Sequence, residues 1–208
     1  MSERKSASQK ARQSRPLSLK TLAIQNRLVG WTKSGRKHWD LYRYLLDTDL
    51  LIDATKMVLS NGGSHGIDGV SCAKVRSMGM KFVLRLQDKL RAKTYRPHAV
   101  RRVYIPKGDG KERPLGIPRI EDRVVQCALL LLLEPIYEQK FLPCSYGFRP
   151  GRRAVKCVAD VSASVYRNRY VIDADIKGFF DHVSHRKLLG MIREEIVDPR
   201  IINLIKSI

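Results

Sequence analysis

One stretch of the sequence places a carboxylate beside aromatic residues at the end of an apolar run. Residues 170–185 read YVIDADIKGFFDHVSH, in which the apolar run delivers Asp175 into a turn just ahead of Phe179 and Phe180. Mg²⁺ takes hard oxygen ligands, and one or two carboxylates together with substrate phosphates satisfy it. Asp175 is therefore a candidate metal ligand. The plainer interpretation is that this aspartate forms a turn or caps a helix, as short polar residues commonly do.

A glycine-rich turn between two short strand-like runs carries two more candidates. Lys107 and Arg113 flank the turn sequence GDGK, and the runs on either side span Ala99–Ile105 and Arg113–Ile117. Asp-Gly is a favoured turn pair, so this segment predicts a β-hairpin. A lysine point charge and an arginine fork can clamp a triphosphate between them. The alternative is an ordinary basic hairpin on a cationic surface.

A third set of residues suits a nucleic-acid surface. Arginines are interleaved with Tyr104, Tyr146 and Phe148 in the middle of the chain. Such a combination of cations and aromatic rings binds the backbone phosphates and unstacked bases of RNA. Tyr146 and Phe148 can equally be core residues that anchor a loop. The candidate RNA-binding arginines are Arg101, Arg102, Arg119, Arg123, Arg149, Arg152 and Arg153.

The charge balance also indicates an acidic partner. The chain has 40 Lys and Arg residues against 20 Asp and Glu, a formal net charge of +20. A globular surface normally mixes the two signs, so this excess points to a polyanion, with nucleic acid first and an anionic membrane second. The apolar runs argue against a membrane, because Ala128–Leu133 is far short of the roughly 20 residues that a spanning helix needs.

The cysteines are scattered and form no C-x-x-C pair: they are Cys72, Cys127, Cys144 and Cys157. Neither zinc nor a disulfide framework is therefore expected, and a reduced, cytoplasmic setting fits this usage. No apolar segment follows the basic N-terminus, so no secretory signal is expected either.

Apolar periodicity and turn residues predict a helix-rich chain with a few short antiparallel strands, an α+β fold. A helix is expected over Asp40–Asn61, with Asp40 as its cap and Gly62 as its stop, and a second over Ala73–Lys93. A third is expected over Glu121–Phe141, where Pro135 should break or kink it. Buried positions are expected at Phe82, Leu86 and Leu90 in the second helix and at Val124, Val125, Ala128 and Leu132 in the third. Later elements are expected at Arg153–Tyr166 (helix), Tyr170–Ile176 (strand), Ser184–Ile196 (helix) and Pro199–Ile208 (helix).

Five segments resemble the opening blocks of group II intron reverse transcriptases, in the order of that family. Together they span about residues 60–190, and a chance match of all five in sequence is hard to produce. The segments are HGIDGVS (65–71), YRPHAVRRVYIPKGDGKERPLGIP (95–118), EDRVVQ (121–126), SYGFRPGRR (145–153) and DADIKGFFDHVSH (173–185).

The resemblance implies a right-hand polymerase and assigns roles to the candidate residues. Asp175 matches the family's metal-binding aspartate, and the backbone carbonyl of Ile176 matches the next ligand. Phe180 matches the ring that excludes a ribose 2′-hydroxyl, so that deoxynucleotides are preferred. Lys107 and Arg113 match the residues that hold the incoming triphosphate. The polar, basic composition of residues 1–20 predicts a disordered arm or an ordinary solvated terminus. The rest of the expected organisation is an N-terminal helical extension (21–63), the fingers (64–168) and the start of the palm (169–208).

The implied reaction is two-metal phosphoryl transfer with Mg²⁺ as cofactor, and the implied partners are template or intron RNA, a DNA primer and dNTP. Asp181 is not a metal ligand in the family and is expected to be structural. The family's second carboxylate pair, in a Y-A-D-D block, has no counterpart in the 208 residues. We therefore expect the chain to hold only part of the active site and to be inactive alone.

Two other interpretations stay open at this point. Group II intron proteins also act as maturases, so the chain can instead be an RNA-binding module that grips intron RNA without polymerisation. A basic ribosomal-type protein explains the charge but not the five ordered blocks. Self-association, or a C-terminal partner that completes the palm, is compatible with the first interpretation, in a bacterial or organellar setting.

Overall fold

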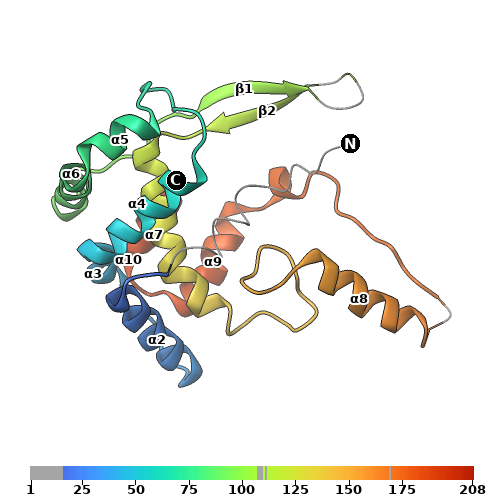
Figure 1. Cartoon of the computed structure of the whole chain (residues 1–208). Coiled ribbons are helices and arrows are strands. Elements are labelled where there is room, and N and C mark those ends of the chain that lie inside the picture. Colours follow the sequence, from blue (N-terminus) through green and yellow to red (C-terminus); the bar gives the residue numbers. More distant parts are fainter. Residues whose placement is uncertain (1–15, 107–109, 111, 169) are drawn as a thin grey trace.

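The structure is a computed structural model that describes residues 16–106, 110, 112–168 and 170–208 (Figure 1). A bundle of helices forms its body, and a β-hairpin and the α8 region project from that body. In chain order the elements are α2 (Leu19–Lys33), α3 (Leu41–Leu45), α4 (Thr48–Asn61), α5 (Cys72–Met78), α6 (Met80–Arg91), β1 (Arg101–Pro106), β2 (Glu112–Ile117), α7 (Ile120–Tyr137), α8 (Ala154–Val165), the 3₁₀ helix η1 (Phe179–His182), α9 (His185–Glu195) and α10 (Pro199–Ser207).

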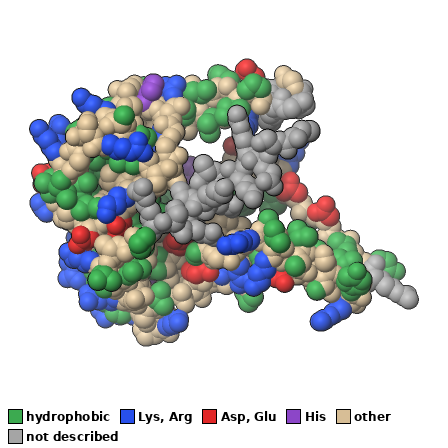
Figure 2. All heavy atoms as spheres, viewed as in Figure 1, with side chains coloured by type: hydrophobic (Ala, Val, Ile, Leu, Met, Phe, Trp, Pro, Cys, Tyr) green, Lys and Arg blue, Asp and Glu red, His purple; other side chains and the backbone are tan. Residues whose placement is uncertain are grey.

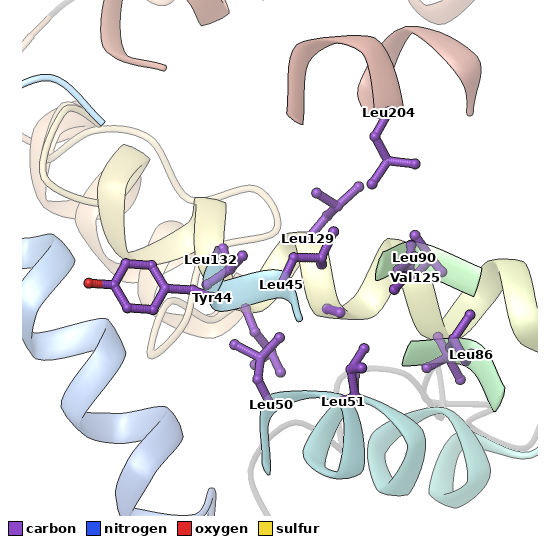
Figure 3. Packing of buried hydrophobic residues seen from close by; sticks show 14 of the residues in the cluster. Tyr44, Leu45, Leu50, Leu51, Leu86, Leu90, Val125, Leu129, Leu132 and Leu204 are labelled. Atoms are coloured by element: carbon purple, nitrogen blue, oxygen red, sulfur yellow. The ribbon is translucent and has the colours of Figure 1, made fainter. Parts of the chain in front are cut away.

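Helix α7 is the centre of the core, and α2, α3 and α4 pack against it. Its apolar residues occur on most sides of the helix, as expected for a helix surrounded by others. Figure 3 shows Leu129 and Leu132 of α7 beside Leu45 of α3 and Leu50 and Leu51 of α4. The buried positions expected from the sequence in α6 and α7 are confirmed.

The helix expected over Asp40–Asn61 is wrong as a single element, because the chain breaks between α3 and α4. Asp47 is the N-cap of α4: its carboxylate accepts a hydrogen bond from the Asp49 backbone N–H at 2.9 Å, so a new helix begins here. The expected cap, Asp40, makes no such bond to α3 and instead pairs with Arg200 at 2.6 Å.

The helix expected over Ala73–Lys93 is also divided, at Gly79. The φ angle of Gly79 is +53°, a left-handed conformation that glycine adopts without steric cost. Pro135, in contrast, does not break its helix, because α7 continues through it to Tyr137. The expected hairpin is confirmed, with β1 and β2 antiparallel and Ile105 paired with Arg113.

The strand expected over Tyr170–Ile176 is not formed. In the described part of the chain β1 and β2 pair with each other, so this extended segment has no ladder partner and its side chains are exposed. The preceding helix, α8, was expected and is present, yet none of its residues is buried. Figure 2 shows hydrophobic side chains at the surface over α8 and the chain that follows it.

The two ends of the described chain are joined by backbone and side-chain hydrogen bonds. The His38 N–H donates to the Glu195 carbonyl at 2.9 Å, and the Val197 N–H donates to the His38 carbonyl at 3.0 Å. The buried carboxylate of Asp198 accepts from the Tyr42 N–H at 2.9 Å. These bonds attach α10 to the N-terminal helices. No helix in the described residues is long and apolar enough to cross a membrane.

The arm expected over residues 1–20 lies mostly outside the described residues. Its last part is helical, because α2 begins at Leu19 after Ser18, whose side chain accepts a hydrogen bond from the Thr21 N–H. The helical extension expected after residue 20 therefore begins inside that segment.

Candidate nucleotide and RNA interface

The candidate metal ligand lies on an exposed turn. Asp175 is exposed, and the side chain of the following Ile176 is 64% exposed. In the described residues no group of three or more His, Cys, Asp or Glu side chains is arranged so that it could hold a metal ion. Metal binding by Asp175 and the Ile176 carbonyl stays a prediction. Mg²⁺ accepts one or two carboxylates when substrate phosphates and water fill the remaining positions.

The aromatic pair behind Asp175 is held by a tight turn. Gly178 adopts a φ of +60° and precedes η1, and its carbonyl oxygen lies 2.7 Å from Nδ1 of His182. The rings of Phe179 and Phe180 contact each other with their centroids 5.6 Å apart. Phe180 is 81% exposed and Phe179 52% exposed, so the turn presents Phe180 to solvent.

The hairpin presents only one of its two candidate residues within the described chain. Arg113 lies on β2 with an exposed side chain, whereas Lys107 lies outside the described residues. On β1 the side chains of Arg102 and Tyr104 are exposed. Figure 1 shows the hairpin and the segment that contains Asp175 as two separate projections from the helical body.

Arg119, a predicted RNA-binding residue, forms an ion pair with the HGIDG loop. Its Nε lies 2.8 Å from Oδ2 of Asp68, and both side chains are about four-fifths buried, at 18% and 20% exposed. Burial alone would raise the pKa of Asp68, but the hydrogen bonds from Arg119 and from the Val70 N–H outweigh it and lower that pKa. The pair joins the loop to the start of α7.

Two further predicted arginines bind backbone carbonyls of the same loop. Arg101 Nε donates to the His65 carbonyl at 3.1 Å, and Arg123 donates to the Ser64 carbonyl through Nη2. We call Arg101, Arg119 and Arg123, with the loop at 63–69 that they hold, the loop brace. The loop brace connects β1, the loop and α7. Each of its three arginines therefore already binds an oxygen atom of the protein itself.

The side chain of Arg149 is only 6% exposed, less than the 18% of Arg119. It donates to the Glu138 carboxylate at 2.7 Å and to the carbonyls of Leu142 and Ser145 at 2.7 and 2.9 Å. Its guanidinium also lies over the Phe141 ring, 5.2 Å from the centroid. Arg149 thus closes the loop after α7.

The remaining candidates lie nearer the surface. Arg152 stacks over the half-buried Tyr146, 5.2 Å from the ring centroid, and the Tyr146 hydroxyl contacts Asp160. Arg102 and Arg153 have exposed side chains. Phe148 is 85% exposed with a φ of +56°, so it is no core residue in this structure. RNA binding by all seven arginines stays a prediction.

Sequence reasoning missed a buried hydrogen bond that supports the hairpin base. The Tyr95 hydroxyl donates to Oδ1 of Asp122 at 2.7 Å, and the His98 N–H approaches Oδ2 at 3.4 Å. Both side chains of the Tyr95–Asp122 pair are buried. The available signal was an aspartate in the first turn of an otherwise apolar helix, which needs a partner when it is buried.

Comparison with known proteins places these features in a family. Residues 105–208 match the family model described as reverse transcriptase (RNA-dependent DNA polymerase). Protein YkfC of Escherichia coli is 37% identical over 191 residues, which cover 88% of this chain and 50% of YkfC. Group II intron-encoded protein LtrA of Lactococcus lactis is 36% identical over 198 residues, 89% of this chain and 31% of LtrA. Nuclear intron maturase 1 of Arabidopsis thaliana is 30% identical over 90 residues, 43% of this chain and 13% of that protein. The chain spans half or less of the length of these relatives.

Proposed function

Because the chain belongs to the group II intron reverse transcriptase and maturase family, we propose that it forms the N-terminal part of an RNA-directed DNA polymerase. In this role it binds template RNA and an incoming dNTP. The observation that carries the proposal is the family match over residues 105–208, which includes Lys107 and Arg113 of the hairpin as well as Asp175. The net charge of +20 supports a nucleic-acid partner independently of that match.

The metal, the triphosphate and the sugar each have a candidate residue in this chain, whereas the family's second carboxylate pair has none. Asp175 and the Ile176 carbonyl would hold Mg²⁺, which supplies charge neutralisation for phosphoryl transfer when bound. Lys107 and Arg113 would bind the triphosphate from the hairpin, where their charges favour the negative transition state. Phe180 would lie against the sugar, and its exposure at the turn supports this role.

The regions have proposed roles of the same kind. Residues 64–168 would act as fingers and residues 169–208 as the start of a palm. The loop brace would then serve to fix the hairpin relative to α7, so that a bound triphosphate meets a rigid surface. The exposed apolar side chains of α8 and of residues 170–172 would be covered by further palm, from a C-terminal partner or by self-association.

A maturase role is the second candidate, and the likeness to a nuclear intron maturase favours it. In this role the chain would grip intron RNA by charge and shape without polymerisation. Such binding needs the cationic surface but does not need Asp175 or Phe180.

Complementation of primer extension tests the polymerase role against the maturase role. The 208-residue chain would be assayed on an RNA template with a DNA primer and dNTPs, first alone and then fused to the C-terminal region of the group II intron-encoded protein LtrA. The polymerase proposal expects synthesis only from the fusion, because the chain alone has no Asp-Asp pair. Tight RNA binding with no synthesis from a folded fusion would favour the maturase role.

A further inference from the structure

Two arginines from different helices converge on one oxygen at the junction of α2 and α3. Tyr44 extends from the leucine core toward α2, with its hydroxyl outermost (Figure 3). Arg27 of α2 donates to this hydroxyl through Nη1 at 3.3 Å, and Arg43 of α3 donates to it through Nη2 at 3.2 Å. Because Tyr44 is 7% exposed, the packing of the core fixes the point at which the two guanidinium groups meet.

The charges of these two arginines are poorly compensated by the protein. In the described part of the chain no carboxylate pairs with Arg27. Asp40 approaches Arg43 at 3.7 Å, but the same carboxylate is bound by Arg200 at 2.6 Å. Two like charges held at one neutral oxygen repel each other, so a bound anion would stabilise this arrangement.

The positive charge of Lys20, in the same region, is by contrast balanced by two carboxylates. Its Nζ lies 2.8 Å from Asp47 and 3.6 Å from Asp49, and these carboxylates raise the pKa of Lys20. Lys20 therefore has partners of its own, while Arg27 and Arg43 have a phenol hydroxyl in common.

The two arginines line a hollow of about 330 Å³ between α2 and the α3–α4 turn, whose other lining residues are Lys20, Ala23, Ile24, Tyr44 and Asp47. The charged side chains of this lining carry three positive charges and one negative charge. Figure 2 shows Lys and Arg side chains along the edge of the molecule where α2 and α3 lie. Guanidinium forks match phosphate oxygens, and a tyrosine hydroxyl can rotate to donate a third hydrogen bond.

We infer that this hollow is a phosphate-binding site in which Arg27, Arg43 and the Tyr44 hydroxyl hold one phosphate of an RNA strand. The assignment to RNA rests on the proposed function, whereas the phosphate chemistry rests on the geometry alone. The site lies outside the nucleotide site around Asp175 and contains none of the arginines singled out from the sequence. A purely structural role, in which the two arginines only tie α2 to α3, predicts no response to phosphate.

Charge-matched double variants test the site in the full chain. Arg27→Gln/Arg43→Gln removes the converging pair, and Lys56→Gln/Lys81→Gln removes two exposed charges from α4 and α6 as a control. RNA affinity would be measured between about 50 and 200 mM salt, where each phosphate contact contributes roughly one unit to the log–log slope. We expect the arginine pair variant to lose about one unit of slope, and about tenfold in affinity at the low-salt end. The control should lose at most a few-fold. Equal losses in the two variants would overturn the inference.

Fluorescence of Trp31 gives a second readout that does not depend on RNA. The Trp31 ring lies 6.4 Å from the Tyr44 ring, and Trp39→Phe leaves Trp31 as the only tryptophan. In the Trp39→Phe chain we expect the fluorescence of Trp31 to change and to reach a plateau as inorganic pyrophosphate is added. That change should disappear with Arg27→Gln/Arg43→Gln and weaken with Tyr44→Phe, which keeps the ring and removes the oxygen.

The two measurements separate this inference from the proposed function. Absence of any RNA binding would defeat the proposed function, and the pyrophosphate titration would then decide the site by itself. A Trp31 response to pyrophosphate without any effect of the arginine pair on RNA affinity would overturn the RNA assignment in favour of a free phosphate ligand. No Trp31 response in the otherwise native chain would overturn the site.

Discussion

Gly66 lies so close to the backbone of Arg119 that a Cβ on Gly66 would be 2.6 Å from the Arg119 Cα and 2.7 Å from its N. Folded proteins do not tolerate such a distance, so the HGIDG loop can contact α7 here only through glycine. The Arg119–Asp68 ion pair forms beside this contact. The loop motif is therefore explained by packing against the base of the hairpin, which is where the loop brace joins β1 to α7.

Gly66→Ala should destabilise the protein by about 1–3 kcal/mol, because an added methyl group must displace backbone rather than a flexible side chain. Gly30→Ala is the matched control, since a Cβ at Gly30 of α2 meets nothing within 4 Å. That change should stabilise the helix by roughly 0.5–1 kcal/mol. Urea unfolding of both variants measures the two free energies. A Gly66→Ala protein as stable as the parent would show that the loop and α7 are not in contact.

The sequence did not reveal that the arginines of the loop brace bind groups inside the protein. The hairpin and the buried stripes of α6 and α7 were predictable, because Asp-Gly turns and apolar periodicity are local signals. The division at Gly79 was missed because apolar spacing continues across it. Which arginine faces RNA and which binds a carboxylate depends on residues distant in the chain. Arg119, which binds Asp68 from 51 residues earlier, is the clearest example.

The Tyr95–Asp122 hydrogen bond should make stability depend on alkaline pH. Burial and the neighbouring Asp122 carboxylate raise the pKa of Tyr95 above its ordinary value near 10. The folded state therefore keeps a proton that the unfolded state loses, so the contribution is complete below about pH 10 and falls above it. Tyr95→Phe should cost about 1–3 kcal/mol at neutral pH, since Asp122 loses its best donor.

Above pH 10 the free energy of unfolding should fall less steeply with pH in the Tyr95→Phe protein than in the parent. The two slopes should differ by about 1.4 kcal/mol per pH unit, the value for one titrating proton. Tyr137, whose pKa burial raises to about 12, is present in both proteins, so its contribution cancels in the comparison. Denaturant titrations at pH 7, 10 and 11 measure the slopes. Tyr166→Phe, at a ring 93% exposed, serves as the control and should change neither quantity. Parallel slopes for Tyr95→Phe and the parent would contradict the assignment.

RNA binding by the chain should weaken steeply with salt. The excess of 20 positive charges implies several phosphate contacts, each of which releases a counterion on binding. We expect the dissociation constant for a structured RNA to rise by orders of magnitude, roughly 10³-fold or more, between 50 and 200 mM salt. Fluorescence anisotropy with a labelled RNA measures it. A constant that barely changes over this range would contradict the electrostatic account.

Asp175→Ala should abolish primer extension by a fusion that restores the C-terminal region, while the 208-residue chain alone should show none in either form. The reason is that a carboxylate ligand to Mg²⁺ cannot be replaced by a methyl group. Asp175 is exposed, so its replacement should change the melting temperature little. Asp88→Ala, on the exposed face of α6, removes the same charge and should retain activity. Robust synthesis by the chain alone would mean that its metal ligands lie elsewhere.

Phe180→Val should change sugar selectivity rather than stability. If Phe180 lies against the nucleotide sugar, a smaller side chain makes room for the ribose 2′-hydroxyl. Selectivity is a difference between two transition-state affinities, so removing a steric exclusion can shift it by several kcal/mol. A core role would instead cost about 3–5 kcal/mol of stability and depress both substrates equally. The 81% exposure of the Phe180 side chain argues for the first outcome.

Phe179→Val is the neighbouring control for this prediction. Successive residues of a 3₁₀ helix such as η1 point about 120° apart, so the two rings cannot face the same sugar even though they contact each other. The measurement is the ratio of kcat/KM for ribo- and deoxynucleotides in the fusion protein, with the melting temperature of each variant. We expect Phe180→Val to raise that ratio with the melting temperature nearly unchanged, and Phe179→Val to leave the ratio as it is. A Phe180→Val protein with lower stability and an unaltered ratio would assign Phe180 to packing, because a residue that only fills space cannot distinguish one sugar from another.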